Sequence, residues 1–171
     1  MKTVLIIAGS DPGAGAGMQQ DLKVATLLGA YGLTVLTALT VQNTTGVQEV
    51  QPVDSRLVAA QLQSLLQDIP VNAVKIGMLG TAANVRAVAQ ALGRSGPEHV
   101  VVDPVLAASH GSLLLEEAGV EVLKEEILPL TTVLTPNLAE AGRLLGRQVA
   151  SVADMEQAAR DLSRLGPPAV L

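Results

Sequence analysis

Apolar runs and amphipathic stretches alternate along the chain. Short runs dominated by Val, Ile, Leu and Thr predict buried strands at residues 4–8, 33–41, 73–77, 100–103 and 132–134, with the first half of another at 169–171. Between these runs, apolar residues recur every three or four positions, which predicts helices through residues 18–28, 54–69, 85–92, 119–128, 137–145 and 151–165. This alternation indicates an α/β fold in which helices cover both faces of a mostly parallel sheet.

Local signals refine several of these elements. The first helix should bury one face and end at Gly29; that face consists of Met18, Leu22, Ala25 and Leu28. A polar turn at residues 42–46 should close the strand at 33–41, with a short extended excursion at 47–53. Ser151 and Asp154 form a capping-box pattern for the last helix, whose inward residues should be Met155, Ala158, Ala159, Leu162 and Leu165.

The apolar run Ala169-Val170-Leu171 resembles a core strand that breaks off in its first half. We therefore expect residues 1–171 to form a single domain that is incomplete at its C-terminal side, truncated at a core strand. A truncated sheet would leave an open edge and uncovered apolar surface.

Composition narrows the classes of function. The chain has 49% hydrophobic residues but only one Tyr and no Phe or Trp, so its core must be aliphatic. A net charge of −5 and the lack of stacking aromatics argue against nucleic-acid binding. No Cys is available for a disulfide, a thiolate metal site or a nucleophile. With no signal peptide and no apolar run long enough to cross a membrane, we expect a soluble cytoplasmic protein.

Polar residues follow the ends of several predicted strands, where parallel sheets bind ligands. The residues at these strand ends are Gly9, Asp11, Gln42, Asn43, Gly77, Met78, Asp103, Asn137 and Glu140, and most of them have polar side chains. Any one of these positions could be polar simply because a strand end meets solvent. Their occurrence at the ends of several neighbouring strands favours one shared binding site.

The loop after the first strand contains Gly9, Gly13, Gly15 and Gly17. It lacks the Gly-Lys-Ser/Thr ending of a Walker A loop, and its spacing is not Gly-x-Gly-x-x-Gly. From the glycines alone, a tight strand-to-helix turn and a ligand-binding loop are about equally supported.

Each candidate side chain also has a structural interpretation. Asp103 and Glu140 could share a hydrated Mg²⁺, although Glu140 could instead stabilise a helix N-terminus that Asn137 caps. Gln42 could read an amide-like ring edge or lie in a solvated turn. Lys75, inside an apolar strand, should extend toward solvent or pair with a carboxylate. His99 and His110 carry no recognisable catalytic context, and we assign them no role.

Taken in order, several runs resemble the hydroxymethylpyrimidine and phosphomethylpyrimidine kinases of thiamine biosynthesis, which have the ribokinase-like fold. The runs that carry the resemblance are 8–12, 15–17, 20–23, 28–32, 37–44, 47–48, 75–79, 101–105 and 134–141. The resemblance covers essentially the whole chain and implies transfer of phosphoryl groups from ATP, with Mg²⁺, to 4-amino-5-hydroxymethyl-2-methylpyrimidine and then to its monophosphate. It also implies that a homodimer is possible.

The family pattern assigns roles to the candidate residues. It implies a pyrimidine pocket bordered by Gly9, Asp11, Ala16, Gln42, Met78 and Val105, with Gln42 bonded to the ring. Asp103, Asn137 and Glu140 would lie toward the nucleotide phosphates, and Asp103 and Glu140 would hold Mg²⁺ mostly through water. By this pattern the first glycine loop is the floor of the acceptor pocket, and ATP phosphates bind elsewhere.

Two family segments have no match in these residues: a Gly-Thr-Gly-Cys/Asp segment that forms the anion hole and helps activate the attacking hydroxyl, and a lysine-bearing Val-Lys-Gly-Gly strand. Both would fall after Leu171, so we expect no catalytic residue within the chain and little activity from these residues alone. Two alternatives stay open, a pyridoxal-type kinase of the same fold and a non-catalytic module that binds the pyrimidine.

Overall fold

The computed structural model describes residues 1–108, 111 and 113–171. Its centre is a parallel six-stranded sheet in the order β2-β1-β5-β6-β7-β8. The strands are β1 (Thr3–Ala8), β2 (Tyr31–Leu36), β5 (Ala73–Ile76), β6 (Val100–Val102), β7 (Val133–Leu134) and β8 (Ala169–Val170). The predicted parallel sheet is therefore confirmed, and each predicted strand has a counterpart in it, although only the first part of the predicted strand 33–41 belongs to β2.

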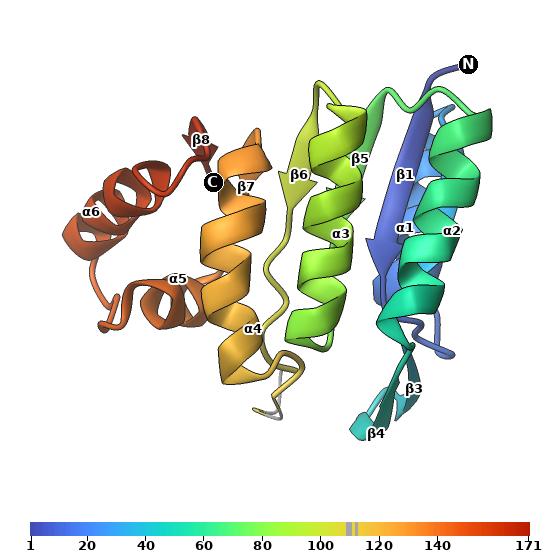
Figure 1. Cartoon of the computed structure of the whole chain (residues 1–171). Helices are drawn as coiled ribbons and strands as arrows, with labels where there is room; N and C mark the ends of the chain where they lie inside the picture. The colour runs from blue at the N-terminus through green and yellow to red at the C-terminus, as the bar shows by residue number, and fades with distance from the viewer. Residues whose placement is uncertain (109–110, 112) are drawn as a thin grey trace.

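Helices cover both faces of this sheet, as predicted. They are α1 (Gly17–Leu27), α2 (Ser55–Asp68), α3 (Ala82–Ser95), α4 (Glu117–Val122), α5 (Leu138–Leu145) and α6 (Val152–Ser163). Figure 1 shows α2, α3 and α4 as one layer in front of the sheet, with α1 behind it. Alternation along β1 matches this arrangement, because Leu5 and Ile7 belong to the main core cluster whereas buried Ile6 lies near Leu22 of α1.

The predicted strand 33–41 is wrong in one respect, since it is two strands in two sheets. The chain leaves the main sheet at Thr37 and continues as β3 (Ala38–Asn43), which pairs antiparallel with β4 (Gly46–Pro52) in a separate hairpin. The buried Thr37 hydroxyl donates to the carbonyl of Met78 at 2.6 Å. The amide of Val53 donates to the carbonyl of Thr37 at 2.9 Å, so the two ends of the hairpin are joined at its base.

The predicted buried face of α1 is also wrong, and that of α6 is wrong at Met155. Helix α1 buries none of its residues, and Leu27 and Leu28 are 86% and 81% exposed. Met155 of α6 is 47% exposed, while Ala158 and Leu162 are buried as predicted. Periodicity identified both helices, but it cannot specify whether a neighbouring element is present to cover each apolar position.

Two short helical turns directly follow the first helix after β6. Helix α4 continues through a π-helical turn, η1 (Leu123–Ile127), and a 3₁₀ turn, η2 (Leu128–Leu130). The predicted capping box of α6 is present, with Ser151 and Asp154 bonded reciprocally. In the part of the chain that the structure describes, no helix combines the length and the apolar character needed to cross a membrane.

Candidate active site

A cavity of about 580 Å³ opens at the carboxyl ends of β1, β5 and β6, with the β3–β4 hairpin forming another of its walls. Its lining comes from residues 8–114. Of the nine residues to which the family pattern assigns a role, seven border it, namely Gly9, Asp11, Ala16, Gln42, Met78, Asp103 and Val105. Asn137 and Glu140 do not line it. The structure therefore brings the proposed acceptor-binding residues together and separates two of the proposed nucleotide-side residues from them.

The glycine loop between β1 and α1 is organised around the buried carboxylate of Asp11. Its oxygens accept hydrogen bonds from the amides of Gly13, Gly15 and Ala16 at 2.8, 3.0 and 2.9 Å. Three backbone amides that could otherwise bind the anion of a ligand are therefore already bonded to the carboxylate of Asp11. This arrangement opposes a phosphate cradle in the loop and favours a role as the floor of a pocket for an uncharged ring.

The start of α1 requires glycine at one position of this loop. Gly17 has a φ of +57°, and a Cβ there would lie 2.6 Å from the carbonyl oxygen of Gly9. That carbonyl also accepts the amide of Met18 at 2.9 Å. The helix therefore begins against the end of β1 and places Gln20 and Asp21 on the cavity wall.

The hairpin is attached to the opposite wall by hydrogen bonds. Thr40 donates its hydroxyl to the carbonyl of Ser10 at 2.8 Å, and Gln42 lies two residues further along the same strand. At the hairpin base, the buried amide of Asn84 donates to the carbonyls of Thr37 and Leu79 at 3.2 and 3.0 Å. These bonds set the position of Gln42 relative to Met78.

Lys75, Asp21 and Asp103 form a charged cluster in the cavity lining. Lys75 Nζ lies 2.7 Å from Asp21 Oδ2 and 3.6 Å from Asp103 Oδ2, and the Lys75 side chain is 25% exposed. The expected pairing of Lys75 with a carboxylate is thus confirmed. Asp21 belongs to the cavity but was not among the predicted site residues, although it lies in the run 20–23 that carries the family resemblance.

Asn137 and Glu140 form a reciprocal capping box at the start of α5. The Asn137 side chain accepts the amide of Glu140 at 3.0 Å, and the Glu140 carboxylate accepts the amide of Asn137 at 2.9 Å. Burial raises the pKa of Glu140, and the nearby charge of Asp103 adds to this, whereas hydrogen bonds from backbone amides oppose it. The structural interpretation of both residues is therefore confirmed.

The described residues contain no group of three or more His, Cys, Asp and Glu side chains arranged to hold a metal ion. Asp103 and Glu140 nevertheless provide hard oxygen donors with an electrostatic coupling between them. Since backbone amides already occupy the Glu140 carboxylate, this donor set fits a hydrated Mg²⁺ that also binds phosphate oxygens. His110 lies outside the described residues.

Comparison with known proteins identifies the family. Residues 11–171 match the family described as phosphomethylpyrimidine kinase. The chain belongs to this family. It is 48% identical over 168 residues to a hydroxymethylpyrimidine/phosphomethylpyrimidine kinase of Rhizobium meliloti, covering 98% of the chain and 63% of that protein. It is 49% identical over 169 residues to a thiamine biosynthesis bifunctional protein of Geobacter sulfurreducens, covering 99% of the chain and 34% of that protein.

Solved structures give the same fold for this phosphomethylpyrimidine kinase family member. A phosphomethylpyrimidine kinase from Clostridium difficile superposes with a TM-score of 0.93 at 37% identity, covering 100% of this chain and 74% of that one. A Staphylococcus aureus pyridoxal kinase in complex with AMP-PCP and pyridoxal gives 0.86 at 37% identity, covering 98% and 60%. The predicted ribokinase-like fold is confirmed. The chain spans less than two thirds of the length of the two curated relatives named above.

Proposed function

We propose that the full-length protein phosphorylates 4-amino-5-hydroxymethyl-2-methylpyrimidine and then its monophosphate, with ATP as the phosphoryl donor. The observation that carries this proposal is the convergence of the family-pattern residues, including Gln42, Met78 and Val105, on one cavity. Membership of the family and the names of the relatives support the reaction. Kinases depend mainly on positioning and on stabilising the charge of the transferred group.

The cavity residues suit a flat, neutral, nitrogen-rich ring. Gln42 offers one carbonyl acceptor and an amino donor, which match the donor and acceptor edge of an aminopyrimidine. Met78 is buried beside Gly9, where its thioether can pack against a ring face, and Val105 adds an apolar wall. Asp11, with three amides bonded to it, would border the acceptor by shaping the loop.

Asp103 and the residues at the start of α5 would bind the nucleotide together with Mg²⁺. Asp103 lies between the cavity and α5, where Asn137 and Glu140 form the start of the helix. When bound with ATP, Mg²⁺ would offset the negative charge of the phosphates. Asp103 and Glu140 would hold it mostly through water, since Glu140 is buried and already bonded to the backbone.

Pyridoxal is the second candidate acceptor, because the pyridoxal kinase of S. aureus has the same fold at 37% identity. Steady-state phosphorylation of the two acceptors by the full-length protein decides between them. We expect a kcat/KM at least about tenfold higher for the hydroxymethylpyrimidine, the effect of one additional hydrogen bond to the ring in a buried site. An equal or higher value for pyridoxal would contradict the proposed acceptor.

Replacing Gln42 by Ala tests the ring contact. We expect pyrimidine affinity, measured by calorimetry on the full-length protein, to fall about tenfold because a hydrogen-bonding contact to the ring is lost. Circular dichroism should show an unchanged fold. Gln51→Ala is the matched control, since Gln51 is an exposed glutamine on the other strand of the hairpin and does not line the cavity. Unchanged affinity in Gln42→Ala would refute the assignment.

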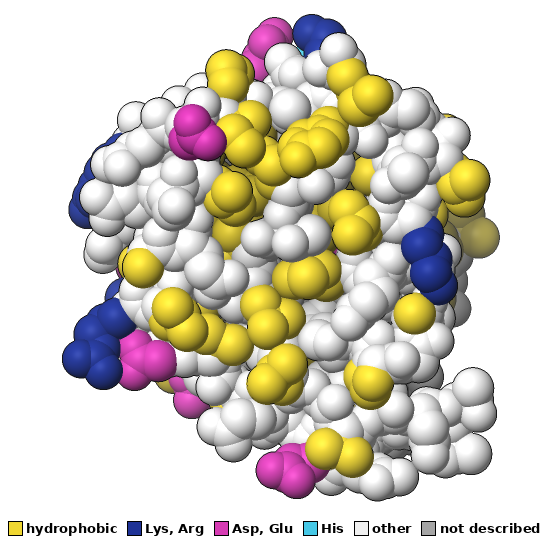
Figure 2. Space-filling model, turned by 90° about the vertical axis from the view of Figure 1, so that its right-hand side faces the viewer, with side chains coloured by type: hydrophobic (Ala, Val, Ile, Leu, Met, Phe, Trp, Pro, Cys, Tyr) yellow, Lys and Arg dark blue, Asp and Glu magenta, His cyan; other side chains and the backbone are white. Residues whose placement is uncertain are grey.

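A homodimer is the proposed assembly. The edge strand β2 and the neighbouring α1 carry Leu27, Leu28 and Tyr31, which are 86%, 81% and 55% exposed. Figure 2 shows that apolar side chains spread over this side of the molecule with few charged groups among them. An exposed apolar surface beside an unpaired edge strand is typical of a protein interface.

A further inference from the structure

Lys75 is placed where a strand residue would ordinarily contribute to packing. It lies on β5, paired in register with Ile6 of β1 and Val101 of β6, near the centre of the sheet. Its side chain extends to the cavity floor, where its ammonium group is close to Asp21 and Asp103. A Cβ at Gly77 would lie 3.1 Å from Lys75 Nζ. The ammonium group therefore lies next to the space that a side chain at residue 77 would fill.

Lys75 supplies the only positive side chain among the described residues that line the cavity. The lining carboxylates are Asp11, Asp21 and Asp103. Asp11 is occupied by three loop amides, but Asp21 and Asp103 face Lys75 with two negative charges against one positive. This local excess of negative charge has little effect on a neutral alcohol, but it opposes entry of a phosphate monoester that carries roughly two negative charges near neutral pH.

An ammonium group has three donors, and Asp21 takes one of them at 2.7 Å. Asp103, at 3.6 Å, is beyond a normal hydrogen bond. At least one donor is therefore available to a ligand in the cavity. Loss of the ammonium would remove that donor and leave both carboxylates uncompensated, so it would affect an anionic ligand much more than a neutral one.

We propose that Lys75 is the specificity-determining residue that allows this cavity to accept a phosphorylated acceptor as well as the free alcohol, through contact of its ammonium group with the phosphate. This inference rests on the proposed function. A nucleotide phosphate has the same chemistry. We assign the contact to the acceptor because Lys75 shares its cavity with Gln42, Met78 and Val105. Of the three residues assigned to the nucleotide side, only Asp103 lines that cavity, and Asn137 and Glu140 do not.

Calorimetric titration of the full-length protein with three probes tests the assignment: the hydroxymethylpyrimidine, its monophosphate and AMP-PCP. In Lys75→Met we expect the monophosphate to bind about tenfold to a hundredfold more weakly, the usual effect of losing a charge-assisted hydrogen bond. The affinities for the neutral pyrimidine and for AMP-PCP should change by less than about threefold, since neither would contact the ammonium group. Lys124→Met is the matched control, because Lys124 pairs with Glu121 and does not line the cavity.

Gly77→Ala provides a second variant that retains the lysine. Its added methyl group would lie 3.1 Å from Lys75 Nζ and should shift the ammonium group by a few tenths of an ångström, so we expect a smaller loss that is again selective for the monophosphate. If Lys75→Met does not fold, the selectivity of this loss tests the proposal. An equal loss for both pyrimidines would overturn the proposal by indicating a merely structural role. A loss confined to AMP-PCP would overturn it in favour of a nucleotide contact. If the unaltered protein bound neither pyrimidine, the proposed function would fail first, and the inference with it.

Discussion

Asp11 is 5% exposed, and its carboxylate is stabilised by backbone amides of the loop that follows it. Asp11→Asn should destabilise the protein by about 1–3 kcal/mol, because an amide oxygen cannot accept all three bonds and its amino group faces other donors. Thermal unfolding measures this loss, and hydrogen exchange at Gly13, Gly15 and Ala16 should become faster. Asp68→Asn, at an exposed aspartate, should change neither. Unaltered exchange in the loop would contradict the prediction.

Glu140 should make stability depend on pH in a defined direction. Burial raises its pKa above the ordinary value of 4.5, so the folded protein retains the proton more strongly than the unfolded chain. Ionisation therefore costs stability above the raised pKa, and this cost disappears as the pH falls below 4.5. In metal-free buffer, Glu140→Gln should be more stable than the unaltered protein at neutral pH, because Gln preserves the capping box without the charge.

The difference between the two proteins should shrink as the pH is lowered, as followed by urea unfolding at a series of pH values. Glu125→Gln, at an exposed glutamate of η1, serves as the control and should show no such trend. The stability of Glu140→Gln should be compared with that of the unaltered protein at each pH. This account would be refuted if the variant's relative stability were lower at neutral pH than at acid pH.

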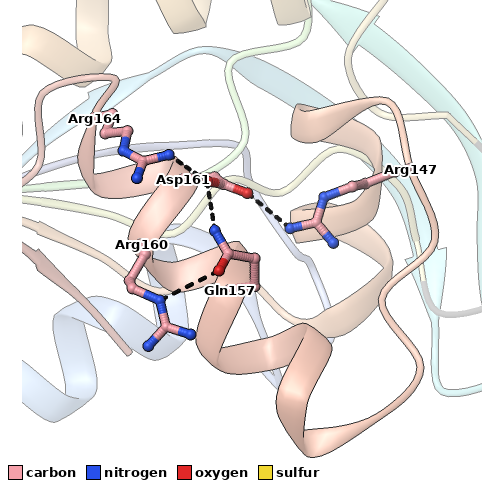
Figure 3. A network of polar contacts seen from close by, with 5 residues as sticks. All are labelled: Arg147, Gln157, Arg160, Asp161 and Arg164. Atoms are coloured by element: carbon pink, nitrogen blue, oxygen red, sulfur yellow. Dashed lines mark hydrogen bonds and ion pairs between the residues drawn. The ribbon is translucent and has the colours of Figure 1, made fainter.

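At the scale of the elements, Asp161 of α6 forms an ion pair with Arg147, which follows the end of α5. Figure 3 shows Asp161 between Arg147, Gln157 and Arg164, with contacts of 2.9, 2.9 and 2.8 Å. Hydrogen bonds from Arg147 and then Gln157 lower the pKa of Asp161. Its stabilising effect is therefore present above the ordinary value of 3.8 and is lost as the pH falls through the lowered pKa.

Asp161→Asn should accordingly unfold at a lower temperature than the unaltered protein at neutral pH, with the two melting temperatures converging in acid. Calorimetric melting across this pH range measures the effect. Glu156→Gln on the same helix is the matched control, because Glu156 is 3.9 Å from Arg160 and has no closer ion pair among the described residues. A difference that persisted unchanged at low pH would show that charge is not the cause.

The sequence predicted a helix well where its periodic run was long and where neighbouring elements cover its apolar face. Val85, Val88, Ala89 and Leu92 of α3 are all buried as expected. The division between β2 and β3 was missed because residues 33–41 have strand character throughout, and nothing in that run marks Thr37 as the exit from the sheet. The chain leaves the sheet there because of a tertiary contact. The Thr37 hydroxyl donates to the carbonyl of Met78, which lies in the loop after β5.

The candidate site was predictable to a similar extent. The rule that parallel strands converge at one edge, together with the family pattern, selected seven residues that border one cavity. It did not identify Asp21, Thr37 or Asn84, whose importance lies in contacts that span more than forty residues of sequence. Spacing along a chain cannot report such contacts, so these supporting residues require the structure.

For the whole molecule, the apolar surface at α1 and β2 predicts self-association. Leu27→Glu combined with Leu28→Glu should convert a dimer into a monomer, because two buried charges would face each other across a symmetric interface. Light scattering coupled to gel filtration measures the mass. Val152→Glu is the control, since Val152 is 72% exposed on α6 and Glu is well tolerated near a helix start. A double variant that stayed dimeric would place the interface elsewhere.

The cavity lining comes entirely from residues 8–114, whereas the start of α5 lies outside it. If the proposed function holds, the described residues that contact the acceptor belong to one contiguous stretch of the sequence, separate from the stretch that holds Asn137 and Glu140. A graft of that first stretch from the S. aureus pyridoxal kinase, which shares the fold with a TM-score of 0.86, should carry its acceptor preference with it. Acceptor choice in this fold can then be recombined as a module, without redesign of the remaining sequence.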